Sequence, residues 1–177
     1  MHLDGARLFN AVVATGIAAA EYARHFETVS FCLSKGLGAP AGSVITGSQS
    51  MIDKLRPLRR MYGGGMRQAG ILAAAGIYAL EHHIARLKED HEHARRLAYL
   101  LQKIPTVSVN PDHVETNIVV FDVAGDRPVA DILTDLKKEG VLINSVGGRG
   151  FRAVTHLDVG SEDIEEAGRV FTLVLSR

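Results

Sequence analysis

The chain has 177 residues, enough for one ordinary domain or two small ones, and its 46% hydrophobic and 23% charged residues are typical of a water-soluble globular protein. The formal net charge of +0 does not favour nucleic acid or an anionic membrane as a partner, because those partners select an excess of Lys and Arg. Cys32 is the single cysteine, which excludes an internal disulfide and a cysteine-based zinc site and suits a reducing compartment such as the cytoplasm.

Targeting signals are not apparent in the sequence. No apolar run approaches the ~18 residues that a membrane-spanning helix needs. The chain also opens with Asp4 close to its start, where a signal peptide would carry basic residues. We therefore expect neither a membrane span nor a signal peptide.

The N-terminal part of the chain alternates between strand and helix patterns. Residues 8–23 are apolar and rich in alanine, which predicts a helix interrupted at Gly16. The stretches TVSFCL (28–33) and GSVITGS (42–48) predict two strands, because β-branched residues dominate and glycines bound the second. The longest helical pattern runs from 66 to about 104, with an Ala- and Gly-rich first half and a charged second half.

The pattern changes after Pro105, which ends that helix. A helix is predicted to start at Pro128 and to stop at Gly140, and Ser161 suits the N-cap of a last helix. Strands are predicted over TVSVN, TNIVVFDV, VLIN and FRAVTHLDV. The apolar face of the last helix consists of Ile164, Ala167, Phe171 and Val174. This alternation predicts the α/β class, with one domain over 1–104 and a smaller one over 105–177.

Two stretches place a charged residue at the end of a predicted strand. HLDGARLFNA carries Asp4 directly before Gly5, and the structural alternative is an acid that caps the following helix. SFCLSKGLGAP carries Lys35 among small residues. A lysine that forms a Schiff base must bring its amine to a carbonyl carbon, so it is held on rigid structure with space around it. The alternative is a surface lysine in a turn.

Two further stretches contain arginines that suit anions. In RRMYGGGMRQAG, three glycines precede Arg67 and are predicted to lead into a helix, an arrangement that can cradle a phosphate; the alternative is a tight turn. In RGFRAVTHLDV, Arg152 lies in a strand-like run, and its guanidinium suits a substrate carboxylate; the alternative is an edge-strand arginine that faces water. Together with Asp4 and Lys35, these parts are those of a pyridoxal phosphate (PLP) enzyme, in which lysine binds the cofactor and a carboxylate pairs with its ring nitrogen.

The residues also carry a family resemblance. HLDGARLFNA, CLSKGLGAPAGS, GGGMRQAGILAAAGIYAL and RAVTHLDV closely resemble the PLP-dependent L-threonine aldolase family, of the aspartate-aminotransferase-like fold type I. The resemblance extends over essentially the whole chain. It implies that 1–104 is the C-terminal part of a PLP-binding large domain with a long interdomain helix, and that 105–177 is a small C-terminal α/β domain.

The resemblance assigns roles around the cofactor ring to three residues. It makes Lys35 the Schiff-base lysine and Asp4 the partner of the pyridinium nitrogen, which it keeps protonated. It places Arg7 beside the ring, near the phenolic oxygen.

The resemblance also assigns anion-binding roles to three arginines. Arg67 is expected at a cofactor phosphate, that of the partner subunit, so a homodimer or homotetramer is implied. Arg60 stands where some relatives have lysine and is expected near the same phosphate. Arg152 is expected to bind the carboxylate of the amino-acid substrate.

The implied reaction is a retro-aldol cleavage of L-threonine or L-allo-threonine to glycine and acetaldehyde, without a metal ion. Members of the family are about twice this long, so we expect the chain to be the C-terminal part of such an enzyme, without the residues that stack on the ring. The remaining histidines are expected on a solvated helix face or loop: His25, His82, His83, His91, His93 and His113. The alternatives are a related PLP β-eliminating lyase, a serine-type aldolase, or a non-catalytic remnant that pairs with a full-length subunit.

Overall fold

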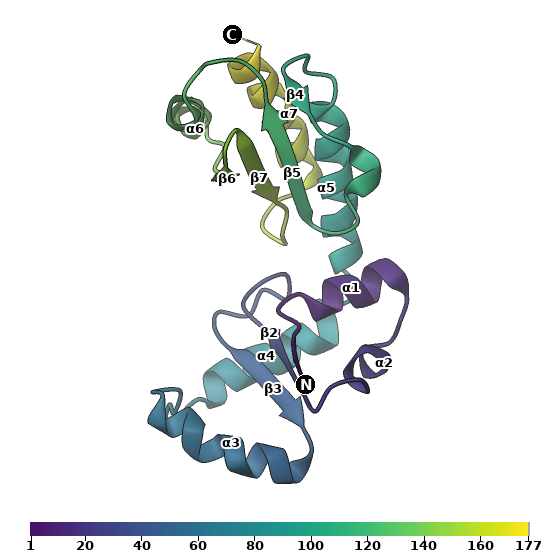
Figure 1. Cartoon of the computed structure of the whole chain (residues 1–177), viewed down its shortest axis with the longest axis vertical. Helices are drawn as coiled ribbons and strands as arrows, with labels where there is room; N and C mark the ends of the chain where they lie inside the picture. Colours follow the sequence, from purple (N-terminus) through teal and green to yellow (C-terminus); the bar gives the residue numbers. More distant parts are fainter. Residues whose placement is uncertain (177) are drawn as a thin grey trace. The chain divides into compact units, whose positions relative to one another are not determined.

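The computed structural model describes residues 1–176 and divides into two compact units, of which the first is Met1–Leu87 and the second begins at Lys88. Figure 1 labels the elements along the chain. The first unit contains strands β1 (His2–Asp4), β2 (Thr28–Cys32) and β3 (Ser43–Gly47), and helices α1 (Leu8–Thr15), α2 (Ala19–Ala23), α3 (Gln49–Met61) and α4 (Gly70–His82). No helix within 1–176 is long and apolar enough to cross a bilayer.

The first unit is built around a three-stranded sheet in the order β1-β2-β3. β1 pairs with β2 in parallel, and β3 pairs with β2 antiparallel. Helix α4 crosses one face of this sheet (Figure 1), where Ala79 and Leu80 pack with Leu33 and Phe31. The helix pattern over 8–23 is confirmed as α1 and α2, which separate at Gly16 as predicted.

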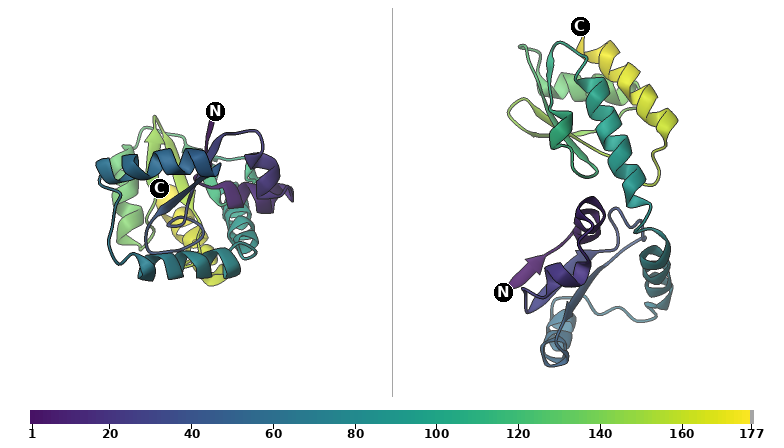
Figure 2. Two further views of the ribbon diagram at one scale, coloured as in Figure 1. Left: turned by 90° about the horizontal axis from the view of Figure 1, so that it is seen from below. Right: turned by 90° about the vertical axis from the view of Figure 1, so that its right-hand side faces the viewer.

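The second unit contains helices α5 (Leu87–Leu101), α6 (Val129–Lys138) and α7 (Ser161–Leu175), a short 3-10 turn at Pro111–His113, and strands β4 (Val107–Ser108), β5 (Ile118–Val123), β6 (Asn144–Gly147) and β7 (Gly150–Val154). Its sheet is antiparallel, in the order β4-β5-β7-β6. Burial alternates along β5, so that Val119 and Phe121 are buried whereas Val120 is exposed. The helices therefore cover one face of this sheet, as Figure 2 shows for α5 and α7.

Several element boundaries differ from the sequence-based prediction. The helical pattern over 66–104 is two helices, because the chain breaks at 83–86, and α5 packs with the second unit. The units therefore divide after Leu87, whereas the sequence predicts a boundary near residue 105. The predicted strand FRAVTHLDV ends early, at Val154, and Gly160 rather than Ser161 is the N-cap of α7.

Candidate active site

Asp4 and the turn that carries Lys35 follow two adjacent parallel strands. Asp4 ends β1, where it pairs with Ser30 of β2. β2 ends at Cys32, and Lys35 follows three residues later. Because the carboxyl ends of adjacent parallel strands lie at the same edge of a sheet, the topology brings the Asp4 carboxylate and the Lys35 turn to one edge.

Gly5 allows the end of β1 to approach β2 closely. Its N–H donates a hydrogen bond of 2.8 Å to the Ser30 carbonyl. A Cβ atom at this position would lie 2.9 Å from that same carbonyl oxygen, closer than real Cβ atoms come to such an atom. A larger residue would therefore push Asp4 away from β2, which explains the glycine after the aspartate.

The chain reverses direction at Lys35 in a hydrogen-bonded turn. The Lys35 carbonyl accepts from the N–H of Gly38 at 2.8 Å, and the Leu33 carbonyl accepts from the N–H of Ala39 at 3.0 Å. Leu33 and Leu37 are buried, with 9% and 3% of their surface exposed. Main-chain bonds and two buried side chains thus fix the segment that carries the lysine.

The Lys35 ammonium and the Asp4 carboxylate both face solvent at this edge. Lys35 is exposed, and among residues 1–176 its ammonium group forms neither a hydrogen bond nor an ion pair. Asp4 is also exposed and accepts one hydrogen bond, of 3.2 Å, from the N–H of Ala6. Arg7 is half-buried at the N-cap position of α1. The edge therefore presents an amine and a carboxylate to a ligand.

The glycine stretch before α4 has a different role from the one predicted. Gly63 adopts a positive φ of 80° after the last turn of α3, its N–H donates to the Arg60 carbonyl at 3.1 Å, and the N–H of Gly64 donates to the Arg59 carbonyl at 2.8 Å. This is the pattern of a glycine C-cap. The prediction that the glycines lead into a helix is therefore wrong, and two of the three glycine N–H groups already bond the end of α3.

The two arginines around that stretch are nevertheless accessible. Arg60 is exposed in the last turn of α3. Arg67 is exposed in the turn that precedes α4, and not in a helix as predicted, because α4 begins at Gly70. Their guanidinium groups are therefore more accessible to an anion than the two glycine N–H groups that bond the end of α3.

Arg152 lies in the second unit, on an interior strand. β7 is flanked by β5 and β6, and Arg152 pairs with Val120 and Asn144. Its side chain is half-buried on the sheet face opposite Phe151, and its Nε atom is buried without a hydrogen-bond partner in the described part of the chain. The alternative of an edge-strand arginine is therefore wrong, and a buried guanidinium N–H favours an acceptor such as a carboxylate.

Three histidines, His83, His91 and His93, are more buried than the sequence predicts, and His93 is half-buried on α5. His91 is only 8% exposed, and burial lowers its pKa from the ordinary value of 6.5, an effect that Asp90 partly opposes and Arg95 reinforces. His83 is half-buried, and its Nδ1 lies 2.6 Å from the Leu37 carbonyl oxygen. The expectation that these three histidines lie on a solvated surface is wrong. His83 packs onto the Lys35 turn, and His91 and His93 lie on α5, which packs into the second-unit core.

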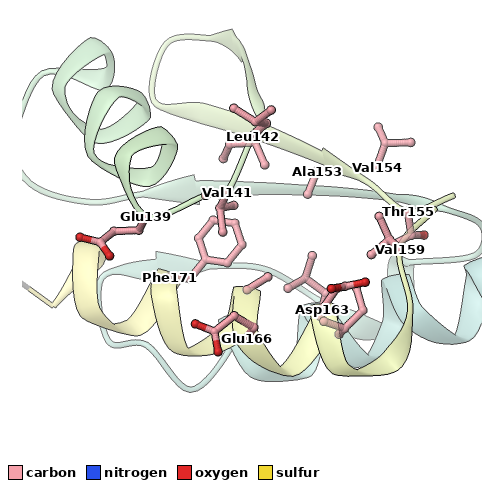
Figure 3. A pocket seen from close by; sticks show the side chains of 15 residues that line it. Glu139, Val141, Leu142, Ala153, Val154, Thr155, Val159, Asp163, Glu166 and Phe171 are labelled. Atoms are coloured by element: carbon pink, nitrogen blue, oxygen red, sulfur yellow. The ribbon is translucent and has the colours of Figure 1, made fainter.

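A cavity lies within the second unit. Its volume is about 230 Å³, and Figure 3 shows it between α7, β7 and the segment after α6. Apolar side chains such as Val141 and Phe171 form much of its wall, with carboxylates from Glu139 and Asp163. The six residues that the sequence analysis singled out do not line it. Arg7 lines a far smaller cavity, of about 10 Å³, beside the Lys35 turn.

Comparison with known proteins decides the family. A family model described as beta-eliminating lyase matches residues 1–124, which include β1, the Lys35 turn and α4. The chain belongs to the beta-eliminating lyase family. This finding agrees with the resemblance to PLP-dependent lyases on which the site was predicted.

Relatives of this beta-eliminating lyase family member include threonine aldolases. The chain is 41% identical over 177 residues to the low specificity L-threonine aldolase of Escherichia coli K12, covering 100% of this chain and 51% of the relative. It is 42% identical over 166 residues to low-specificity L-threonine aldolase 1 of Arabidopsis thaliana, covering 93% and 46%. The chain thus spans about half the length of the curated relatives it matches.

A solved structure supports the predicted fold class. The ornithine aminotransferase of Toxoplasma gondii, whose description places PLP at its active site, matches with a TM-score of 0.65 at 18% identity, covering 98% of this chain and 42% of that one. At this identity the likeness shows the fold alone. The predicted α/β fold of PLP-dependent fold type I enzymes is confirmed.

Proposed function

We propose that the chain is part of a PLP-dependent lyase that cleaves L-threonine or L-allo-threonine to glycine and acetaldehyde. The observation that carries this proposal is the meeting of Asp4 and the Lys35 turn at one edge of the first-unit sheet. The family match supports a lyase, and the threonine aldolase relatives support threonine cleavage in particular.

The residues at the sheet edge fit PLP chemically. PLP has an aldehyde, a ring nitrogen that can be protonated and a phosphate. The aldehyde needs an amine to bind it, and the protonated ring nitrogen needs a carboxylate as its partner. Lys35 offers an exposed amine without an ion pair in the described residues, and Asp4 offers a carboxylate with a single hydrogen bond. Bound there, PLP would supply an acceptor for the electron pair released when the Cα–Cβ bond of the substrate breaks.

Lys35 and Asp4 would handle protons and orientation in this reaction. The Lys35 amine would attach the cofactor and give way to the amine of the incoming substrate, and the rigid turn would limit the directions from which it approaches. The Asp4 carboxylate would hold a proton on the ring nitrogen through a charge-assisted hydrogen bond. Arg7, at the start of α1, would lie near the phenolic oxygen of the ring.

The arginines would hold the anionic ends of cofactor and substrate. Arg67 and Arg60 are exposed and would bind a cofactor phosphate, Arg67 that of a partner subunit in a homodimer or homotetramer. Arg152 would bind the substrate carboxylate through two parallel N–H···O bonds. Exposed apolar side chains on α4, Ile71 at 83% and Ile77 at 57%, supply surface for such a subunit contact.

β-Elimination is the second candidate function, because the matched family is described by that reaction. It would use the same Lys35 and Asp4 but release ammonia and a 2-oxo acid. A third outcome is a chain that is inactive alone and pairs with a full-length relative.

Product analysis tests the proposal. The chain is incubated with PLP and L-threonine or L-allo-threonine, and acetaldehyde and glycine are measured beside ammonia and 2-oxo acid. We expect acetaldehyde and glycine in equal amounts. Asp4→Ala should lower the rate about a hundredfold or more at unchanged circular dichroism, because removing one partner of an ion pair leaves the other charge uncompensated. Near-normal turnover by Asp4→Ala, or ammonia as the main product, would contradict the proposal.

A further inference from the structure

His83 contacts the turn that carries Lys35, although it lies 48 residues further along the chain (83 minus 35). It follows the last residue of α4, and its Nδ1 lies 2.6 Å from the Leu37 carbonyl oxygen. Because a carbonyl oxygen only accepts hydrogen bonds, Nδ1 carries the proton and donates it. The neutral ring therefore has its free lone pair on Nε2.

Through this contact the imidazole donates a hydrogen bond to the turn from outside it. The carbonyls of Leu33 and Lys35 are bonded within the turn, by Ala39 and Gly38 respectively. The carbonyl of Leu37 belongs to the next part of the turn, on a residue that is only 3% exposed, and it accepts from His83. A buried carbonyl without a donor is strongly unfavourable, so the imidazole fixes the orientation of this peptide unit.

Tyr78 holds the imidazole in its place from one turn earlier on α4. The rings of Tyr78 and His83 meet edge to face, with centroids 5.4 Å apart and planes at 85°. Tyr78 also contacts His82, at 4.3 Å, but His82 is exposed and has no hydrogen bond to the turn in the described residues. The two adjacent histidines therefore share the contact with Tyr78, but in the described residues only the half-buried His83 bonds Leu37.

We propose that His83 is a positioning residue that fixes the Lys35 turn against the end of α4. It acts on the amine through the peptide units of residues 35–38 and does not touch the cofactor. The effect of His83 on cofactor attachment rests on the proposed function. Its effect on the conformation of the turn does not, and it can be measured without PLP.

Side-chain geometry provides matched variants. The Nδ2 of asparagine lies at nearly the same place along the side chain as the Nδ1 of histidine, so His83→Asn keeps the donor. His83→Gln carries the amide donor one carbon further from the main chain, and His83→Ala removes the side-chain donor altogether. His82→Ala removes a neighbouring imidazole that also contacts Tyr78 but does not bond the turn, and it serves as the control.

Two measurements on the full chain test the proposal. The first is hydrogen exchange at the N–H groups of Gly38 and Ala39, and the second is the rate at which PLP becomes attached to Lys35, trapped by borohydride. We expect His83→Ala and His83→Gln to speed exchange and to slow attachment, each by about tenfold, the effect of one buried hydrogen bond. His83→Asn should restore both values to within about twofold, and His82→Ala should match the parent.

The outcomes separate this proposal from the proposed function. Exchange in His83→Ala equal to that in His82→Ala overturns the positioning role. Faster exchange with an unchanged attachment rate also overturns it, because the turn then moves without affecting the amine. Faster exchange, rescued by His83→Asn, in a chain whose Lys35 never takes up PLP supports the fixing of the turn and instead refutes the proposed function.

Discussion

The two units of the chain differ sharply in how much apolar surface they bury. The core of the second unit contains 18 buried apolar residues, contributed by all three of its helices and by its sheet. The core of the first unit contains five, from the Lys35 turn, α4 and Leu87. Yet Asp4 and Lys35, the residues to which we assign chemistry at the cofactor, both lie in the first unit. The proposed reaction is thus carried by the part of the chain with fewer buried contacts.

The difference also shows in what each unit leaves exposed. Ten of the sixteen large apolar side chains that are exposed within 1–176 belong to the first unit. Its sheet has only three strands, of which β1 and β3 are both edges. In the first unit a single contact between two strands, such as that of β1 with β2 at Gly5, therefore contributes a large share of the stability. In the second unit the stability is spread over a large core.

Truncating the centre of the second core should have the largest effect. Phe121 is 2% exposed and contacts the rings of Phe151 and Phe171, at 5.6 and 5.7 Å between centroids. Phe121→Ala should lower the free energy of unfolding of the second unit by about 3–5 kcal/mol. Chemical denaturation followed by hydrogen exchange of β5 and α7 measures this.

The matched control for that change lies next to it on the same strand. Val120 is 54% exposed on the opposite face of the sheet, so Val120→Ala should change the stability by about 0.5 kcal/mol or less. Equal effects of the two substitutions would show that the second unit has no one-sided core.

A single methyl group should destabilise the first unit. Gly5→Ala places a Cβ 2.9 Å from the Ser30 carbonyl oxygen, which is main chain and cannot move aside easily. We expect a loss of about 1–3 kcal/mol, seen as faster hydrogen exchange in β1 and β2.

Gly70→Ala provides the comparison for that change. Gly70 is the first residue of α4 and has no atom within 4 Å of an added Cβ. Alanine favours a helix over glycine by up to about 1 kcal/mol, so this variant should be neutral or slightly more stable. A Gly5→Ala chain as stable as Gly70→Ala would refute the close approach of β1 to β2.

The smallest expected effect is a pH dependence confined to the second unit. Burial lowers the pKa of His91, so the folded state takes up a proton less readily than the unfolded state, whose histidine has a pKa near 6.5. Well above that pH the buried histidine does not lower the free energy of unfolding. As the pH falls below it, the free energy of unfolding decreases by at most about 1.4 kcal/mol per pH unit, because the unfolded state binds one more proton. His91→Gln should flatten the stability curve between about pH 6.5 and pH 5.

The exposed histidine of the same unit is the control. His113 lies in the 3-10 turn at Pro111–His113 and is exposed. His113→Gln should leave the slope of stability against pH as it is in the parent chain. If His113→Gln and His91→Gln flatten the curve equally, the burial of His91 is not the cause.

The elements that the sequence predicts best are those whose patterns depend only on neighbours in the chain. The β-branched run TNIVVFDV located β5, alanine content located α1 and α2, and Pro128 with Gly140 bounded α6. The break between α4 and α5 escaped prediction because the sequence EHHIARLKED contains neither glycine nor proline. α3 also escaped, and it tolerates Pro57 in its interior.

Features of the site that depend on distant parts of the chain were harder to predict. The interior position of Arg152 follows from β6 pairing with β7 rather than from its own sequence. The burial of His91 follows from the packing of α5 into the second-unit core. By contrast, the sequence already grouped Asp4 and Lys35 as parts of one PLP site, because each stands at or just after the end of a strand-like stretch. The parallel pairing of β1 with β2, which brings them to one edge, is seen only in the structure.

The attachment of PLP to Lys35 tests the central claim most directly. The purified chain is incubated with PLP, reduced with borohydride and digested, and the pyridoxyl mass is located by peptide mapping, with Lys35→Ala and the exposed Lys88 as references. We expect a modification concentrated on Lys35 that disappears in Lys35→Ala and weakens in Asp4→Ala. A modification spread evenly over Lys88 and the other exposed lysines, or none at all on Lys35, would contradict it.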